Sequence, residues 1–253
     1  MRLRRIIILV IVLLTILLGL LVFNIFINAN NEDSHNNVNN DSDSNIIDTI
    51  FNGFNTVNLG SNNKGTVDLI GPIGNKNSNV KIAYIIGVHP LESNVHNALY
   101  DSLKVKSDSL NYSYYIYKIT VTDSPDDYNV GRMNGQLLAN EFVVPDATSK
   151  NYNLVIDIHS NQGTQGGNYD ETNFIFAPLN DYKSKVLADE IIAKIPPLLY
   201  YYPMSQTSPN YVTVPIMQSG TPTLIYETYM YESSEITLDY INKLINTIDN
   251  LKL

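Results

Sequence analysis

Four side chains in the sequence are of types that bind a metal ion or take up a proton, and each lies where an apolar segment ends. His89 and Glu92 follow a segment that ends at Gly87, in "IIGVHPLESNVH", while His159 ends "NLVIDIH" and Glu227 ends "TLIYE". A hydrolytic zinc site needs three protein ligands and one open position, and a carboxylate outside the ligand set to take a proton from water. We therefore expect His89, Glu92 and His159 to bind Zn²⁺ and Glu227 to act as general base.

Each of these residues also has an ordinary interpretation. An H-x-x-E pair often arises by chance, His159 alone could bond to backbone, and Glu227 alone could be a surface carboxylate. An unpaired carboxylate at a buried strand end would be costly, so the combination favours a site. His96 competes with this set, because it lies four residues after Glu92 and shares a helical face with it. We expect His96 to be a helix-surface or supporting residue, since three ligands are already supplied.

The segments that position these residues alternate between strand and helix patterns. Apolar runs typical of strands cover Val80–Gly87, Tyr114–Val121, Asn153–Ile158, Asn173–Ala177 and Thr223–Glu227. Helical spacing of apolar residues covers Glu92–Lys106, Asn134–Val143 (ended by Pro145), Asp181–Ile195 and Ser234–Leu251. This alternation favours an α/β fold with a mixed, largely parallel sheet flanked by helices. In such sheets, sites collect at the carboxyl ends of the strands.

Three short motifs, "GVHPLESN", "DIHSNQG" and "IYETY", together resemble the zinc carboxypeptidase superfamily, and more closely its aspartoacylase and succinylglutamate desuccinylase branch. The resemblance covers most of Val80–Tyr229. It implies a zinc carboxypeptidase-like fold, Zn²⁺ bound through the first two motifs, and the later glutamate as general base and acid. The implied activity is hydrolysis of an amide bond in a peptide or an acylated amino acid. Because the gap from Glu92 to His159 is short for a full carboxypeptidase, we expect some crossover elements to be missing.

Two further polar residues fit this picture. Arg132, in "DYNVGRMNGQ", resembles the arginine that in the superfamily holds a substrate carboxylate or stabilises charge on the scissile carbonyl. The family often has Asn directly before it; here Gly131 stands there, and we expect Asn134 to substitute in part. Asp157 lies two residues before His159 and so on the same side of a strand. It either orients His159 or pairs with a lysine.

The first 45 residues differ from the rest of the chain. Residues 6–27 carry no charge and as a helix would span roughly 33 Å, enough to cross a bilayer. Arg2, Arg4 and Arg5 precede them, and no Lys or Arg follows until Lys64. We expect a cytoplasmic stub (1–5), one transmembrane helix (6–27), a disordered polar tether (28–45) and an extracytoplasmic domain (46–253). A cleavable signal peptide is the alternative, although its apolar core would be only about 7–15 residues long.

Composition narrows the function further. Without the three N-terminal arginines, 13 basic residues face 25 acidic ones, a net charge of −12, which argues against nucleic-acid partners. No cysteine is present, so disulfides and thiolate chemistry are excluded. The sequence favours a membrane-anchored, outward-facing metallopeptidase or amidohydrolase, with a substrate that could derive from the cell wall. The alternative is a surface binding or scaffolding domain on the same fold, in which the ligand side chains need not converge.

Overall fold

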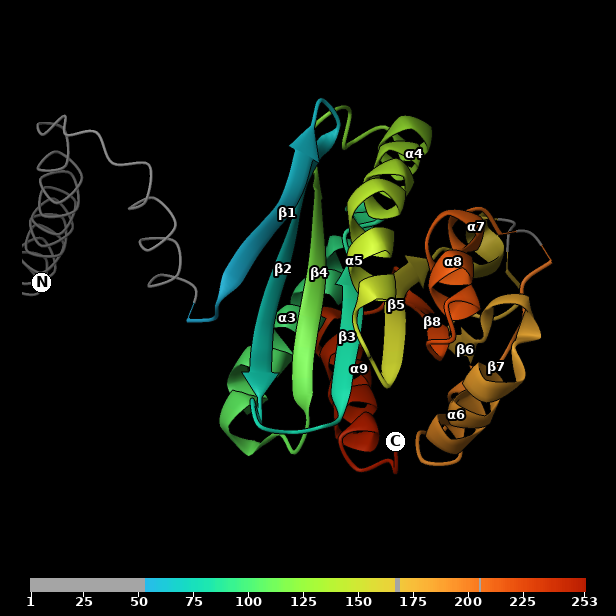
Figure 1. Cartoon of the computed structure of the whole chain (residues 1–253). Coiled ribbons are helices and arrows are strands. Elements are labelled where there is room, and N and C mark those ends of the chain that lie inside the picture. Colours follow the sequence, from blue (N-terminus) through green and yellow to red (C-terminus); the bar gives the residue numbers. More distant parts are fainter. Residues whose placement is uncertain (1–52, 167–168, 205) are drawn as a thin grey trace, which may run out of the picture. The chain divides into compact units, whose positions relative to one another are not determined.

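The computed structural model describes residues 53–166, 169–204 and 206–253. The expected stub, transmembrane helix and tether, at 1–45, lie outside these described residues. Within them, no helix combines the length and the apolar character that crossing a bilayer requires. The described residues are built around one mixed sheet with helices on both of its faces (Figure 1).

The sheet has the strand order β1-β2-β4-β3-β5-β8-β6-β7. Its strands are β1 (Thr56–Asn62), β2 (Gly65–Gly74), β3 (Lys81–Ile86), β4 (Ser113–Val121), β5 (Leu154–Asn161), β6 (Phe174–Phe176), β7 (Leu199–Tyr200) and β8 (Thr223–Tyr229). The central strands β4, β3, β5 and β8 run parallel, and β6 pairs parallel with β7, whereas β1 with β2, β2 with β4 and β6 with β8 pair antiparallel. The expected mixed α/β architecture is confirmed, and it brings the carboxyl ends of β3, β5 and β8 side by side.

Each face of the sheet has its own core because side chains alternate along the strands. One core joins Tyr84 and Ile156 to the apolar sides of α3 (Ser93–Lys106), α6 (Tyr182–Ile192) and α9 (Ser234–Ile248). The other joins Ile85 and Val155 to α4 (Tyr128–Leu138), α5 (Val144–Ser149) and α8 (Thr213–Gln218). A further short helix, α7 (Ser208–Tyr211), precedes α8. These two layers hold the central strands rigidly beneath the site.

The first two strands form a hairpin that the sequence patterns do not indicate. No residue of β1 is fully buried, and its exposed and partly exposed residues do not alternate as in a half-buried strand. β2 contains Gly71 and Pro72, which usually interrupt a strand. Here they fall where the register between β2 and β4 shifts, at an irregularity that accommodates both residues.

The helix expected over Asn134–Val143 begins earlier and continues further, so both expected ends are wrong. α4 starts at Tyr128, and the Asp127 side chain caps it by accepting from two backbone N–H groups. A π-helical turn (Ala139–Val143) and α5 continue the chain, so Pro145 lies in the first turn of α5. The earlier start gives Arg132 a place on a helix instead of a loop.

Two strands extend beyond the residues that were expected to end them. β5 runs through Asn161 and β8 through Tyr229, because the two strands remain paired along that length. In this pairing His159 lies directly opposite Glu227. Both residues therefore belong to the regular sheet, with backbone positions that the ladder fixes.

Candidate metal centre

The loop after β3 brings two of the expected ligands together. Gly87 adopts a φ of +85°, which lets the chain turn away from the sheet. Residues Pro90–Glu92 then form a 3₁₀ turn, with the N–H of Glu92 donating to the carbonyl of His89 at 3.1 Å. This turn directs His89 and Glu92 toward β5.

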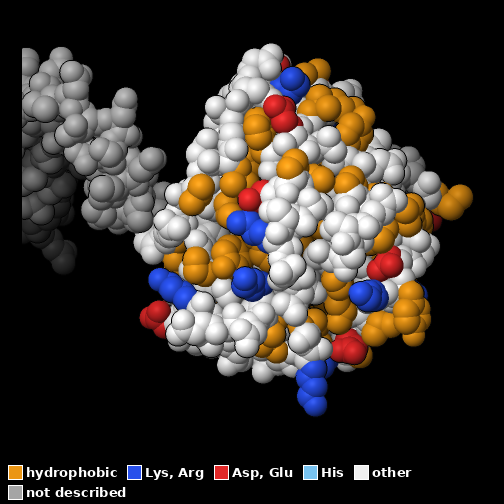
Figure 2. Space-filling model, viewed as in Figure 1, with side chains coloured by type: hydrophobic (Ala, Val, Ile, Leu, Met, Phe, Trp, Pro, Cys, Tyr) orange, Lys and Arg blue, Asp and Glu red, His pale blue; other side chains and the backbone are white. Residues whose placement is uncertain are grey.

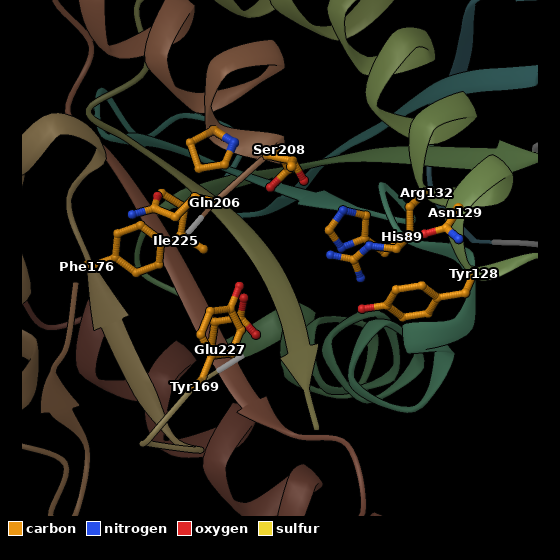
Figure 3. Close-up of a pocket in the computed structure, with 12 residues that line it drawn as sticks. His89, Tyr128, Asn129, Arg132, Tyr169, Phe176, Gln206, Ser208, Ile225 and Glu227 are labelled. Atoms are coloured by element: carbon orange, nitrogen blue, oxygen red, sulfur yellow. The ribbon is translucent and has the colours of Figure 1, made fainter. Parts of the chain in front are cut away.

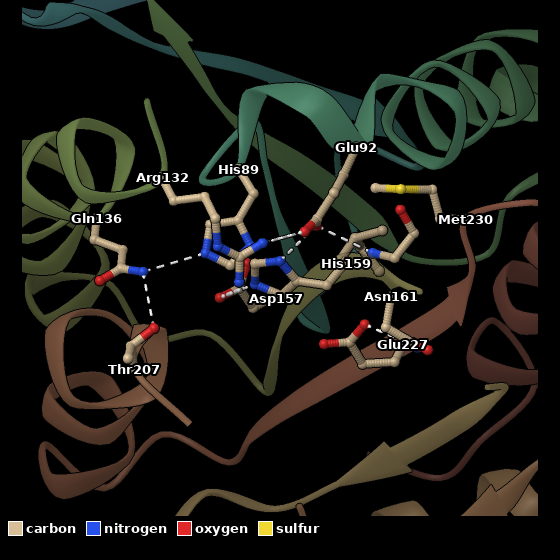
Figure 4. A network of polar contacts seen from close by, with 12 residues as sticks. His89, Glu92, Arg132, Gln136, Asp157, His159, Asn161, Thr207, Glu227 and Met230 are labelled. Carbon is tan, nitrogen blue, oxygen red and sulfur yellow. Dashed lines mark hydrogen bonds and ion pairs between the residues drawn. The ribbon is translucent and has the colours of Figure 1, made fainter. Parts of the chain in front are cut away.

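His89, Glu92 and His159 form a buried cluster whose potential ligand atoms all lie within 4.8 Å of one another. Three atoms at that limit share a point about 2.8 Å from each (4.8 Å divided by √3). Nδ1 of His89 lies 2.9 Å from Oε1 of Glu92, and Nδ1 of His159 lies 2.9 Å from Oε2 (Figure 4). Each exposes 3% or less of its surface. The cluster thus presents two imidazole nitrogens and a carboxylate, a donor set that suits zinc.

Both imidazole rings are also held through their second nitrogen. Nε2 of His159 lies 2.9 Å from Oδ2 of Asp157, at an ion-pair distance but without hydrogen-bond alignment. Nε2 of His89 lies 3.2 Å from the side-chain nitrogen of Gln136. Ligand histidines in metal sites are commonly fixed in this way by a partner on the far side of the ring. The residues present therefore fit a zinc ion, and Nδ1 is the nitrogen of each ring that faces Glu92.

Helix α4 lies directly against the loop that carries His89. A Cβ atom on Gly135 would come within 2.0 Å of the carbonyl oxygen of Val88, and one on Gly131 within 3.2 Å of Pro90. Gly131, which stands where the family often has Asn, is therefore explained by close packing. The same packing brings Arg132 to the site, where its Nη1 donates to Oε1 of Glu92 at 2.9 Å.

A cavity of about 210 Å³ opens beside the cluster. His89, Arg132 and Tyr128 lie on one side of it, Phe176, Ile225 and Gln206 on the other, and Glu227 faces it between them (Figure 3). The lining also includes Asn129, Tyr169, Thr207, Ser208 and Pro209. One predicted ligand, His89, thus lines this cavity together with the predicted base Glu227. Glu92 lines a smaller cavity that also has Arg132 and Glu227 in its wall.

Burial and neighbouring charge shift the pKa values of this site in opposite directions. Burial raises the pKa of the Glu227 carboxyl to about 8, and the negative charge of Glu92 adds to the rise. Burial lowers the pKa of His89 to about 4. For Glu92, burial opposes ionisation, but His89 and His159 hold its pKa well below the usual range. For His159, burial also opposes the charge, but Asp157 and Glu92 hold its pKa well above the usual range. Such divergent shifts are typical of functional sites.

Other predicted residues lie outside the cluster. Asn134 donates to the backbone oxygen and the carboxylate of Asp123, and it does not line the cavity. His96 is buried on α3, where its Nε2 lies 2.9 Å from the carbonyl oxygen of Ile158. It supports the sheet beneath the site and contributes no atom to the ligand cluster.

Sequence reasoning missed Gln136, Asn129 and Thr207. For Gln136 a signal was available, because it follows Arg132 by four residues and shares its helical face. That signal required the correct helix start. Asn129 and Thr207 lie in segments whose course no sequence pattern indicated.

Comparison with known proteins places the fold. No family model matches the sequence, and no curated protein matches it. A metallo-carboxypeptidase from Burkholderia cenocepacia has a similar structure, with a TM-score of 0.51 and 13% identity over 79% of this chain and 67% of that one. So does a metallo-carboxypeptidase from Pseudomonas aeruginosa in complex with (2-guanidinoethylmercapto)succinic acid, with a TM-score of 0.50 and 12% identity over 82% of this chain and 67% of that one.

This chain spans about two thirds of the length of those two proteins. At such low identity the likeness shows the fold, which is zinc carboxypeptidase-like. The aspartoacylase and succinylglutamate desuccinylase branch stays a prediction. The fold and the His89–Glu92–His159 cluster together support a metal-dependent hydrolase.

Proposed function

We propose that this protein is a zinc-dependent hydrolase of an amide bond in a peptide or an acylated amino acid. One observation carries the proposal: His89, Glu92 and His159 form a buried cluster, and Arg132 and Glu227 line both the cavity that His89 borders and the one that Glu92 borders. A binding or scaffolding domain would need no buried carboxylate facing such a cluster. In a binding or scaffolding domain the side chains of His89, Glu92 and His159 would also be free to diverge, whereas here they lie together.

The residues have distinct tasks in this mechanism. When bound, zinc would act as a Lewis acid, which lowers the pKa of the attacking water and polarises the carbonyl group of the substrate. Glu227 takes the proton from the attacking water and then delivers it to the leaving nitrogen. A cation bound beside the cavity favours the ionised form of Glu227, which is the form that can accept a proton in this first step.

Arg132 stabilises the negative charge that develops on the carbonyl oxygen. Its contact with Glu92 engages one nitrogen, Nη1, and the guanidinium has five N–H donors in all. The side chain keeps 23% of its surface exposed and lies 4.9 Å from the centre of the Tyr128 ring. Arg132 is therefore placed to reach substrate from the rim of the cavity.

The location of the protein and the source of its substrate are part of the proposal. The uncharged segment 6–27 and the arginines before it support a single-pass protein in the cell membrane, with its catalytic domain outside. An outside location suits a peptide derived from the cell wall. On the face shown in Figure 2, acidic and basic side chains of the described residues are intermingled and form no basic patch of the kind that nucleic acid requires.

The test measures metal content first and turnover second. Purified protein should contain about one zinc per chain by mass spectrometry, and a His89→Ala/His159→Ala variant should contain none. The loaded protein is then assayed on a panel of peptides and acylated amino acids, beside Glu227→Gln. Absence of zinc after incubation with the ion at neutral pH, or full activity in a folded and zinc-loaded Glu227→Gln variant, would refute the proposal.

A further inference from the structure

We propose that Gln136 is a positioning residue that holds His89 in either of its two tautomers, and that it reverses its side-chain amide when the metal binds. The proposal rests on the metal site argued above. It concerns the far side of the His89 ring, away from the ligand cluster.

Gln136 is fixed at the base of the site. It is 2% exposed and lies on α4, which the close approach of Gly135 to Val88 holds against the His89 loop. Its amide nitrogen lies 3.2 Å from Nε2 of His89 and 3.3 Å from the hydroxyl of Thr207 (Figure 4). Its amide oxygen is buried without a hydrogen-bond partner among the described residues. The amide nitrogen of Gln136 thus has two hydrogen-bond partners, whereas its amide oxygen has none among the described residues.

In the metal-free arrangement the proton of His89 belongs on Nδ1. This atom lies 2.9 Å from the Glu92 carboxylate, which can only accept. Nε2 then carries a lone pair, and the N–H of Gln136 faces it as a donor. The amide orientation in the structure therefore matches this tautomer.

A metal bound at Nδ1 reverses the requirement. Nδ1 must then offer its lone pair, so the proton of the neutral ring moves to Nε2. An amide N–H facing that proton would repel it, whereas the amide oxygen would accept it. Rotation of the Gln136 amide by half a turn supplies that oxygen, which can also accept from the Thr207 hydroxyl.

Glutamine suits both states, and few side chains do. A carboxylate at position 136 would accept only, which matches the metal-bound tautomer alone, and an apolar side chain would match neither. His159 differs, because its far-side partner Asp157 is a carboxylate. His159 therefore has a partner that can only accept, Asp157, whereas His89 has a partner, Gln136, that can either donate or accept.

Zinc affinity of variants tests the role. We expect Gln136→Glu to bind zinc about tenfold more tightly than wild type and Gln136→Met to bind it about tenfold more weakly, in line with the effect of such outer partners. The measurement is competition with a chromophoric chelator at fixed pH. Gln218→Glu is the matched control, because it adds the same charge at an exposed position on α8 and should leave the affinity unchanged.

The tautomer itself gives a second readout that needs no turnover. In ¹⁵N NMR of histidine-labelled wild type, the His89 proton should move from Nδ1 to Nε2 on addition of zinc. In Gln136→Glu the ring would lie between two carboxylates, as His159 does, so without metal it should carry a proton on both nitrogens and lose the one on Nδ1 when zinc binds. This readout stands even if Gln136→Met does not fold.

Two results would overturn the inference while leaving the metal site intact. One is a wild type that binds zinc and variants that bind it equally well; the other is a His89 proton on Nε2 in the metal-free wild type. A wild type that binds no zinc would overturn the metal site and the role of Gln136 together.

Discussion

Replacing Glu227 by glutamine should stabilise the metal-free protein while it abolishes turnover. In the folded protein the Glu227 carboxyl keeps its proton up to about pH 8, whereas the unfolded chain releases it near the ordinary value of 4.5. Between these values the folded state binds more protons, so its stability falls as the pH rises. Above pH 8 the full cost is present. A shift of about 3.5 pKa units corresponds to about 5 kcal/mol.

Glutamine has nearly the same shape and no charge to bury, so this cost disappears. The difference in unfolding free energy between Glu227→Gln and wild type should be close to zero at pH 4 and should grow to about 5 kcal/mol at pH 9. For a domain of this size that corresponds to a rise in melting temperature of roughly 10–20 °C. A variant that is more stable but inactive would show that the Glu227 carboxylate serves function at the expense of stability.

The assay is urea or thermal unfolding at pH 4, 7 and 9 in the presence of a chelator, since a bound cation would favour the ionised carboxylate. Glu190→Gln, an exposed carboxylate on α6, is the matched control and should follow wild type at every pH. Parallel pH profiles for wild type and Glu227→Gln would show that burial does not perturb Glu227, and the reasoning would fail.

Three other predictions concern the residues around the cluster. Asp157→Asn should weaken zinc binding by about tenfold or more in chelator competition, and unchanged affinity would mean that Asp157 does not orient His159. Gly135→Ala should destabilise the fold by about 1–3 kcal/mol in urea, because its Cβ would meet the carbonyl of Val88 at 2.0 Å; wild-type stability would refute the close packing of α4. Arg132→Ala should lower kcat by roughly 10²–10³ with zinc content unchanged, whereas a change confined to KM would assign Arg132 to binding alone.

The central strands and the metal-ligand residues could be predicted from the sequence because each is marked by residues close together in the chain. Residues 82–86 form an unbroken apolar run, and the fold confirms the strand expected over Val80–Gly87, with its ends trimmed to Lys81 and Ile86. A buried parallel strand is apolar on both faces, so its pattern does not depend on its neighbours. That His89, Glu92 and His159 meet followed from placing all three at the same edge of a sheet.

What the sequence could not supply depends on packing between elements. Tyr128, Asn129 and Val130 at the start of α4 are exposed and show no apolar periodicity, so only the cap at Asp127 marks its beginning. Asn134 was expected at the site as a partial substitute for the asparagine that the family has before Arg132. Gln136 was not, because Arg132 was not expected to share a helix with it. The end of β5 likewise reflects its pairing with β8, which no local pattern in either strand encodes.

The pairing of His159 with Glu227 across two strands has a consequence for how the protein can evolve. Inserting or deleting one residue in β5 or β8 would turn these side chains to the opposite face of the sheet and end the chemistry. The wall of the cavity formed by residues 206–209 belongs to no strand and carries no such restriction. Under the proposed function we therefore expect substrate preference to be easier to alter at Gln206, Ser208 and Pro209 than at the paired strands, with Thr207 retained because it contacts Gln136.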